Sequence, residues 1–404
     1  MHSLANLAFL FFRVFEETIP IEHLELFDDS KVLQEAQAPE KSSPSSTLRF
    51  KDLVPVLYQE GRYQGDNVTL GVGGFGRVEL MTTVNHGAYY AVKRVSKKNI
   101  VAKRQEEHML FEKAILKSIQ CDFIVRYHRH RRQTQSLMYR ELGSVSQVFN
   151  AAFVFSFCRL HAAFKDTRYI HMVMEFCAGG EIWTKLKEVG RFDEPVAVFC
   201  TACVVEAYAY LHKKNIMYRD LKPENLMLDA KGYVKLVDFG FAKMMVRGEK
   251  TYSFVGTPEY MAPEIIKNQG HDFAVDFWSL GVLIFELLVG SPPFSSSEPQ
   301  KIYAKILDGV LKYPPYLSEA AKSIISKLCR PRPGQRLGNT KNGIKDVRHH
   351  RWFSSMNWHK LRVGQLNAPT VRLIRKGPCY INFDRFPADQ TKAEEEFSGW
   401  DRDF

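Results

Sequence analysis

The sequence predicts an α+β fold with two lobes, in which a β-rich first part precedes a helical second part. Between residues 68 and 95 three segments alternate apolar and polar side chains, as antiparallel strands do, and a fourth covers 169–176. A further amphipathic helix is expected within this part, over 105–119. After Gly180 the apolar residues recur at helical spacing, which predicts helices over 181–189, 193–213, 273–289, 298–308 and 318–329.

The composition places the chain among globular proteins of roughly two or three domain-sized units. Of its 404 residues, 45% are hydrophobic and 25% are charged, so the chain can bury a sizeable core. These proportions exclude a collagen, a largely disordered chain and a small disulfide-stapled protein. The formal net charge of +11 permits anionic partners, such as nucleotides, nucleic acid or lipid headgroups, but selects none of them.

Cysteine spacing and hydropathy favour a cytoplasmic protein without a transmembrane segment. The 7 cysteines are irregularly spaced, which suits a reducing compartment. Cys200 and Cys203 form a CxxC pair inside an apolar helical pattern, which favours two buried thiols over a metal or redox pair. No apolar run reaches the roughly 18 residues of a membrane helix. The apolar stretch 4–12 lacks a basic region before it, which favours a leader over a signal peptide.

Two regions do not fit the pattern of a continuous domain. Residues 1–64 show weak periodicity and contain a Pro- and Ser-rich stretch, so we expect a leader or linker there. Residues 127–159 interrupt a strand pattern that would otherwise run smoothly from Arg126 into Leu160. Because the strand pattern continues in frame when these residues are left out, we favour the hypothesis that they are translated non-coding sequence. A genuine insertion stays open as the alternative, because closing a loop of that length costs only modest entropy.

A glycine-rich segment points to phosphate binding. Residues 71–78 read GxGxxGxV, and glycine lets backbone N–H groups close over phosphates. Dinucleotide-binding folds share GxGxxG, but there the motif opens a helix and an acidic residue follows about 20 positions later. Here a strand follows, and it contains Lys93 among apolar residues. A lysine that holds phosphate oxygens needs a carboxylate to orient it, and Glu112 on the next predicted helix can supply one.

The strongest signal is Tyr-Arg-Asp-Leu-Lys-Pro-Glu-Asn at 218–225, which matches the catalytic-loop pattern of protein kinases except for its first residue. Asp220 would accept the proton of a substrate hydroxyl, and Lys222 would neutralise charge on the transferring phosphoryl group. Asn225 and Asp238, which begins Asp-Phe-Gly, offer the oxygen ligands that Mg²⁺ prefers. One short hairpin fits between them. The sequence therefore predicts a triphosphate held in a cleft between Lys93 and Asp238.

These motifs, in this order, resemble the eukaryotic protein kinases over residues 65–353. Residues 354–404 resemble the C-terminal tail of the AGC group, in which a segment like 382–386 wraps back over the nucleotide. Tyr218, where most kinases have His, is normal for this group. Within the group the chain is most similar to the cGMP-dependent protein kinases, on the segments 69–80, 201–207, 235–243, 339–347 and 398–404.

The resemblance implies a bilobal kinase fold with a small β-rich N-lobe over 65–177, including the insertion, and a larger helical C-lobe over 178–353. It implies a serine/threonine kinase of cGMP-dependent type that uses ATP and Mg²⁺. Met174 would be the gatekeeper and Glu175 to Cys177 the hinge that contacts adenine. The full nucleotide site would comprise Gly71, Val72, Gly73, Gly74, Phe75, Gly76, Arg77, Val78, Ala91, Lys93, Met174, Glu175, Cys177 and Met227.

The resemblance also implies a site for basic protein or peptide substrates, because charge-assisted Arg–carboxylate pairs select arginine. The carboxylates for arginines upstream of the acceptor would be Glu181, Glu224 and Glu286. An apolar pocket for the residue after the acceptor would consist of Phe254, Pro258 and Met261.

Ser253 aligns with the activation phosphosite of the group. A phosphate there could pair with Arg219, Lys243 and His108, and so tie the catalytic loop to the helix that carries Glu112. A buried ion pair is expected elsewhere, between Glu264 and Arg336, with a structural role.

Several alternatives remain beside the kinase hypothesis. A catalytically silent kinase-fold scaffold, broken by the insertion, is the alternative function. The family carries cyclic-nucleotide domains before the kinase lobe, and these are not found in residues 1–64, so cGMP control by this chain alone is not expected. We expect a monomer. The basic run 126–132 lacks stacking aromatics, so no nucleic-acid partner is expected, and Arg131 to Thr134 has the form of a substrate in cis.

Overall fold

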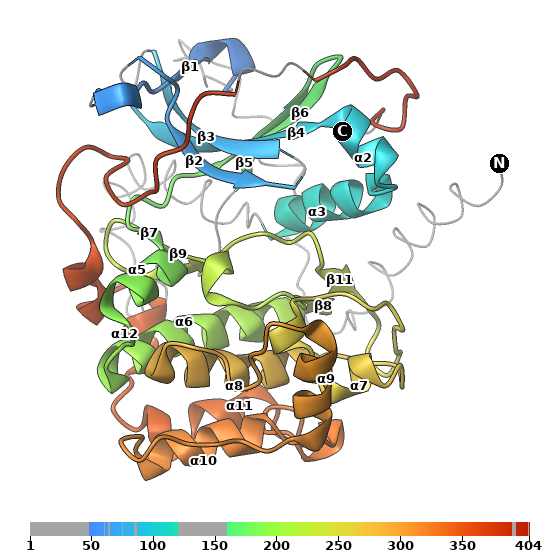
Figure 1. The fold of residues 1–404 in the computed structure, drawn as a ribbon, viewed down its shortest axis with the longest axis vertical. Coiled ribbons are helices and arrows are strands. Elements are labelled where there is room, and N and C mark those ends of the chain that lie inside the picture. The colour runs from blue at the N-terminus through green and yellow to red at the C-terminus, as the bar shows by residue number, and fades with distance from the viewer. Residues whose placement is uncertain are drawn as a thin grey trace, which may run out of the picture. The chain divides into compact units, whose positions relative to one another are not determined.

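An antiparallel sheet forms the first part of the structure (Figure 1). This computed structural model describes residues 48–119 and 160–404, except 60, 64, 75, 85, 86, 390–392 and 403. The predictions for Phe75, for residues 1–47 and for the insertion 127–159 lie outside the described residues. The strands pair in the order β1-β3-β4-β6-β5, with β2 on β3. Their bounds are β1 Leu53–Pro55, β2 Thr69–Gly73, β3 Gly76–Thr83, β4 Tyr89–Ser96, β5 Leu160–Lys165 and β6 Tyr169–Glu175.

Strand β4 shows why these residues form a two-faced sheet. Successive side chains of a strand point to opposite faces. Val92 is fully buried with Val173 in a small cluster on one face, whereas Ala91 and Lys93 line a cavity on the other. Helix α3, Glu106–Ser118, supplies residues to the same cavity. The alternation of the sequence thus places Lys93 on the face of the sheet where the cavity lies.

The second part is helical, as predicted, and its helices follow the predicted ranges within about one residue (Figure 1). Helix α6 begins at Glu194 because the Asp193 side chain accepts from the backbone N–H of Val196, and its many apolar residues are buried along most of its length. Its length and composition would suit a membrane span, but it is a core helix of this unit. The long helices are α5 Ile182–Val189, α6 Glu194–Lys213, α8 Ala274–Val289, α9 Pro299–Asp308 and α10 Glu319–Leu328.

Three short strand pairs complete the region where the two parts meet. The hairpin of β9, Leu226–Leu228, and β10, Val234–Leu236, lies between the catalytic-loop motif and Asp238, as the spacing predicted. Strand β7, Gly180–Glu181, adds to its edge. A separate pair joins β8, Ile216–Met217, to β11, Lys243–Met244. These short strand pairs bring the motif that contains Asp220 and the motif that begins at Asp238 to the same edge of the β9–β10 hairpin.

The cysteine prediction is confirmed within α6. Cys200 and Cys203 are free and almost fully buried. Burial raises the pKa of both thiols, that of Cys203 to about 12. Such thiols stay protonated and unreactive, and they act as small apolar residues of the core.

The structure differs from the predicted start of the folded unit. That unit begins at Leu48, not after residue 64. Strand β1 pairs with β3, and Tyr58 is only 1% exposed. The sequence pattern that would predict a strand is weak here, because β1 is only three residues long and pairs with β3, which follows much later in the chain. A second difference is helix α2, Lys97–Ala102, which the sequence analysis did not predict.

The C-terminal residues run from the helical part to the sheet, along one side of the structure (red in Figure 1). At the helical end, Arg375 donates to Glu188 at 2.6 Å, and Asn382 accepts from Lys185 at 3.0 Å. At the sheet end, Lys97 and Asp401 form an ion pair of 2.7 Å with both side chains nearly buried. The tail therefore bridges the two parts through polar contacts.

Candidate active site

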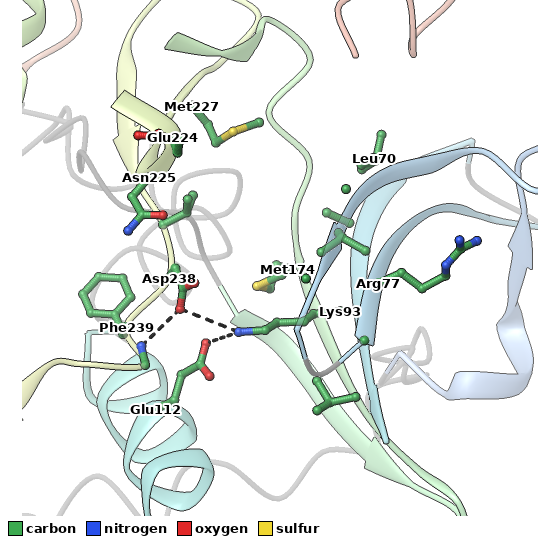
Figure 2. Close-up of a pocket in the computed structure, with 18 of the residues that line it drawn as sticks. Leu70, Arg77, Lys93, Glu112, Met174, Glu224, Asn225, Met227, Asp238 and Phe239 are labelled. Carbon is green, nitrogen blue, oxygen red and sulfur yellow. Dashed lines mark hydrogen bonds and ion pairs between the residues drawn. The ribbon is translucent and has the colours of Figure 1, made fainter. Parts of the chain in front are cut away.

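A cavity of about 510 Å³ lies between the sheet and the helical part (Figure 2). Every described residue of the predicted nucleotide site lines it, from the glycine-rich hairpin, β4, β6 and β9. The sequence analysis missed several apolar lining residues, because nothing in their local pattern separates them from core residues. Among them are Leu70, Val95, Met109 and Leu116. Phe176 of the predicted hinge and Phe383 of the tail segment 382–386 also line the cavity.

The glycine-rich segment forms the hairpin between β2 and β3, which covers the cavity. At Gly76 a Cβ atom would lie 1.9 Å from the carbonyl oxygen of Arg94, so only glycine fits there. The stem of Arg77 lines the cavity, but its guanidinium donates to the carbonyl of Pro387 at 3.1 Å. Arg77 therefore joins the hairpin to the tail.

Lys93 meets two carboxylates in the cavity (Figure 2). Its Nζ lies 2.7 Å from Glu112 of α3 and 3.8 Å from Asp238. Burial alone would lower the pKa of Lys93, but the carboxylates of Asp238 and Glu112 raise it above its ordinary value. The Lys93 ammonium in turn lowers the pKa of Asp238. The lysine therefore stays charged, and the two sides of the cleft are joined by one cation.

The catalytic-loop residues form one hydrogen-bonded group. Asp220 is 4% exposed. Its Oδ1 accepts from the hydroxyl of Thr257 at 2.8 Å, and Lys222 lies 3.1 Å from its Oδ2. Asn225 donates from Nδ2 to Asp220 Oδ2 at 2.9 Å. Asp220 is thus held in one direction at the cavity wall by its neighbours, and Thr257 is a contributor that the sequence analysis missed.

Asp276 on α8 fixes the backbone of the catalytic loop. It is fully buried and accepts from the backbone N–H groups of Tyr218 at 3.0 Å and Arg219 at 2.9 Å. Arg219 has a positive φ of 68°, a strained conformation that such contacts maintain. Nothing near Asp276 in the sequence predicts this role. Tyr218 itself donates its hydroxyl to the carbonyl of Val237 at 2.5 Å, and so connects the loop to the residue before Asp238.

The donor set at Asn225 and Asp238 suits Mg²⁺ in company with phosphate. Both residues line the cavity, and Asp238 also has a positive φ, of 55°. No cluster of three or more His, Cys, Asp or Glu able to hold a metal occurs among the described residues. Mg²⁺ commonly binds through one or two carboxylates together with substrate phosphates. The residues present therefore fit a metal that arrives with a nucleotide.

The three predicted peptide-binding carboxylates are electrostatically coupled. Burial, and then the charge of Glu224, raise the pKa of Glu181 to about 7. Burial raises the pKa of Glu286 to about 7 as well, with Glu224 adding to the shift, although the Tyr260 hydroxyl donates to Glu286. Burial also raises the pKa of Glu224. The charge of Glu224 therefore acts on both Glu181 and Glu286.

The predicted apolar pocket is less clear in the structure. Met261 is buried, whereas Phe254 is 56% exposed and packs its ring edge-on against Tyr303 at 5.9 Å. Pro258 opens a short helix beside them. Met261 lines a small cavity that neither Phe254 nor Pro258 lines. The pocket stays a prediction.

Ser253 lies beside two of its three predicted cations. Arg219 donates to its hydroxyl at 2.6 Å, and Lys243 donates to the neighbouring Thr251 at 2.8 Å. The ring of His108 instead pairs with Gln105 at 2.6 Å and lines the cavity. Arg336 and Glu264 form the expected buried ion pair, at 2.8 and 3.0 Å.

The fold and the cleft together define the class of protein. The model of the protein kinase domain family matches residues 65–156 and 131–353, and the chain belongs to this family. The two matched stretches meet in the region of the insertion at 127–159.

The relatives make the comparison more specific. The chain is 46% identical over 362 residues to cGMP-dependent protein kinase 2 of Homo sapiens, which covers 88% of this chain and 43% of that protein. It is 46% identical to the enzyme of the same name from Rattus norvegicus, over 83% of this chain and 40% of the relative. With cGMP-dependent protein kinase, isozyme 2 forms cD5/T2, of Drosophila melanogaster the identity is 44%, over 83% and 33%. The chain thus spans less than half the length of these relatives.

Proposed function

We propose that this chain is a serine/threonine protein kinase that transfers the γ-phosphoryl group of ATP to Ser or Thr in arginine-rich peptides. The observation that carries the proposal is the position of Lys93, 2.7 Å from Glu112 and 3.8 Å from Asp238. A lysine fixed by a carboxylate beneath a glycine-rich hairpin, opposite a metal-binding acid, is the arrangement that phosphoryl transfer from a nucleotide requires.

In the proposed mechanism the protein supplies position and charge. The glycine-rich hairpin directs backbone N–H groups to the phosphates, and Lys93 holds their oxygens. Asp220 orients the substrate hydroxyl and accepts its proton, while Lys222 offsets negative charge on the transferred group. Asn225 and Asp238 would hold Mg²⁺, which when bound neutralises phosphate charge. Phe383 and the apolar lining exclude water from the cleft.

The preference for basic peptides is supported by the like charges of Glu181, Glu224 and Glu286. The ionised Glu224 disfavours the charged forms of Glu181 and Glu286, and an arginine placed beside it would relieve that repulsion. The proposal places the chain in the cytoplasm, where thiols such as the free Cys177 and Cys329 persist.

The test is ATP-dependent phosphorylation of an Arg-Arg-x-Ser peptide by the full chain. Asp220→Asn keeps the size of the side chain and should lower kcat by about 10²- to 10⁴-fold, because the proton acceptor is lost. Asp229→Asn, in the turn of the β9–β10 hairpin, serves as the control and should leave the rate within about two-fold of the wild-type rate.

Two results would contradict the proposal. Transfer that Asp220→Asn leaves unchanged would show that another residue accepts the proton. A folded wild-type chain that binds ATP but transfers no phosphate to any Ser or Thr peptide would favour the silent scaffold. The assay on a chain without 127–159 then shows whether the insertion is responsible.

A further inference from the structure

Basic side chains surround the segment that carries Ser253, with Arg219 half-buried and Lys243 exposed. Arg219 donates to the Ser253 hydroxyl at 2.6 Å. Lys243, on β11, donates to the Thr251 hydroxyl at 2.8 Å, and the hydroxyls of Thr251 and Ser253 are 3.4 Å apart. The two cations therefore approach the same pair of hydroxyls from different elements.

Neither cation is neutralised by an ion pair in the part of the chain that the structure describes. Burial lowers the pKa of Arg219 to about 10, although Asp276 opposes this. Burial, and then the charge of Arg219, lower the pKa of Lys243. Each charge is therefore less stable here than in water, and an anion placed between them would remove the repulsion.

His271 is the third basic group at this place. An isolated antiparallel bridge joins it to Thr251, with hydrogen bonds of 3.0 and 2.9 Å in the two directions. Residues directly opposite in such a pair extend their side chains on the same face, about 5 Å apart. The imidazole of His271 thus lies on the same face as the Thr251 hydroxyl, which is in contact with Ser253.

The imidazole is buried without a complete set of partners. His271 is 2% exposed, and its Nε2 is among the buried polar atoms that have no hydrogen-bond partner in the described structure. Buried polar atoms in folded proteins are nearly always paired, so such an atom needs an explanation. Beside two cations that have no ion-pair partner among the described residues, the group that this atom suits is an anion.

We propose that His271 is the third ligand of a phosphate on Ser253, and that it becomes protonated and donates from Nε2 when the phosphate is attached. This rests on the proposed function only in taking Ser253 as a phosphorylated residue. Arg219 and Lys243 complete the site, with Thr251 at its base. The buried imidazole makes the phosphorylated segment sensitive to pH.

The sign of the pH effect follows from the charged groups that face His271. In the unphosphorylated chain, burial and the charges of Arg219 and Lys243 lower the pKa of His271 to about 4, against the opposing effect of Glu264 and Asp272. Between pH 4 and about 6.5 the unfolded chain then binds more protons at this residue than the folded chain does. Stability at this residue therefore falls as the pH falls.

A phosphate reverses that sign. A dianion beside His271 raises the pKa of the imidazole above its ordinary value of about 6.5. The resulting stabilisation is complete below the unfolded value and is lost as the pH rises through the raised value. Because the second pKa of phosphoserine is about 6, the effect is clearest between about pH 6.5 and 8.5, where the phosphate stays mostly dianionic.

The experiment places phosphoserine at position 253 of the full chain during translation, by suppression of a stop codon. The phosphate then does not depend on the activity of the chain. Titration by ³¹P NMR gives the second pKa of the phosphoserine, and thermal unfolding gives the gain in Tm over the Ser253 protein at each pH. Wild type is compared with His271→Gln, which keeps a hydrogen-bond donor but cannot become charged.

We expect the phosphoserine pKa to be lower in the wild type than in His271→Gln by about one unit, because a nearby imidazolium favours the dianion. We expect the gain in Tm to be larger at pH 6.5 than at pH 8.5 in the wild type and independent of pH in the variant. His359→Gln, an exposed histidine on helix α12, Trp358–Arg362, is the matched control and should behave as the wild type.

Equal phosphoserine pKa values in wild type and His271→Gln would overturn the proposal. If His271→Gln does not fold, the wild-type chain with and without the phosphate on Ser253 still tests the proposal. A gain in Tm that does not vary with pH would contradict a ligand that titrates. Peptide phosphorylation is measured on the same preparations. If no phosphate is transferred but the phosphoserine pKa is shifted, the proposed function is rejected and the phosphate site is kept. If phosphate is transferred but the phosphoserine pKa is the same in both proteins, the phosphate site is rejected and the proposed function is kept.

Discussion

The cleft and the segment around Ser253 handle charge in opposite ways. In the cleft, Lys93 lies between two carboxylates at 2.7 and 3.8 Å, so each charge already has a partner. Around Ser253, Arg219 and Lys243 gather with His271, and like charges face one another. The difference indicates how each region is completed. A paired group is organised before a ligand arrives, whereas a group of like charges becomes stable only when an ion of opposite charge joins it.

Removing the ion pairs of Lys93 in the cleft should have the largest effect on activity and on stability. Lys93→Met removes the cation that we propose holds phosphate oxygens, and we expect kcat/KM for the Arg-Arg-x-Ser peptide to fall about 10³-fold. It also leaves the buried Glu112 without its partner, at a cost of about 3 kcal/mol in the free energy of unfolding. Urea denaturation and the peptide assay measure the two effects separately.

The double variant Lys93→Met with Glu112→Gln is the control for this prediction. It removes both charges, so stability should recover most of the loss while activity stays low. Recovery of activity together with stability would mean that Lys93 matters only for folding.

The three carboxylates Glu181, Glu224 and Glu286 allow a second test, for which we expect a smaller effect on activity. Because the pKa of Glu181 and that of Glu286 are raised to about 7, both are partly protonated at pH 6 and ionised at pH 8. We expect KM for the Arg-Arg-x-Ser peptide to fall several-fold over that range, since arginine binds the ionised form. An Ala-Ala-x-Ser peptide should show no such change.

The raised pKa values of Glu181 and Glu286 also determine how the stability of the folded chain changes with pH. A raised pKa in an acid means that the folded chain binds more protons than the unfolded one between pH 4.5 and about 7, so stability falls as the pH rises through that window. Glu181→Gln should flatten both profiles, and Glu298→Gln, an exposed residue, is the control. A KM for the arginine peptide that does not vary with pH would show that these acids do not bind it.

An exposed pair should show the smallest effect. Arg372 and Asp193 lie 2.5 Å apart, but their side chains are 60% and 48% exposed. We expect Arg372→Ala to change the free energy of unfolding by less than about 0.5 kcal/mol, because solvent and salt screen the pair. Urea denaturation at low and high salt is the measurement. A loss above about 1 kcal/mol would mean that this contact anchors the tail more firmly than its exposure indicates.

Much of the site could be predicted because its residues lie in short contiguous motifs. Gly71 to Val78 and Tyr218 to Asn225 each encode a local backbone shape that carries its functional groups with it, so their type and spacing are sufficient. The strand-rich first part and the helix-rich second part of the sequence predicted the two-lobed fold. The longer helices, such as α6 and α8, followed from apolar periodicity alone, since burying one continuous face needs no knowledge of the partner.

Tertiary structure alone decided the contacts between residues far apart in the chain. Asp276 holds the catalytic loop from another helix, and His271 meets Thr251 through a single bridge. Each of these residues has an ordinary local pattern, and its role arises from what folding places beside it. The sequence determined which groups are available and their local geometry, and the packing of distant segments determined which charges are paired and which are left to repel one another.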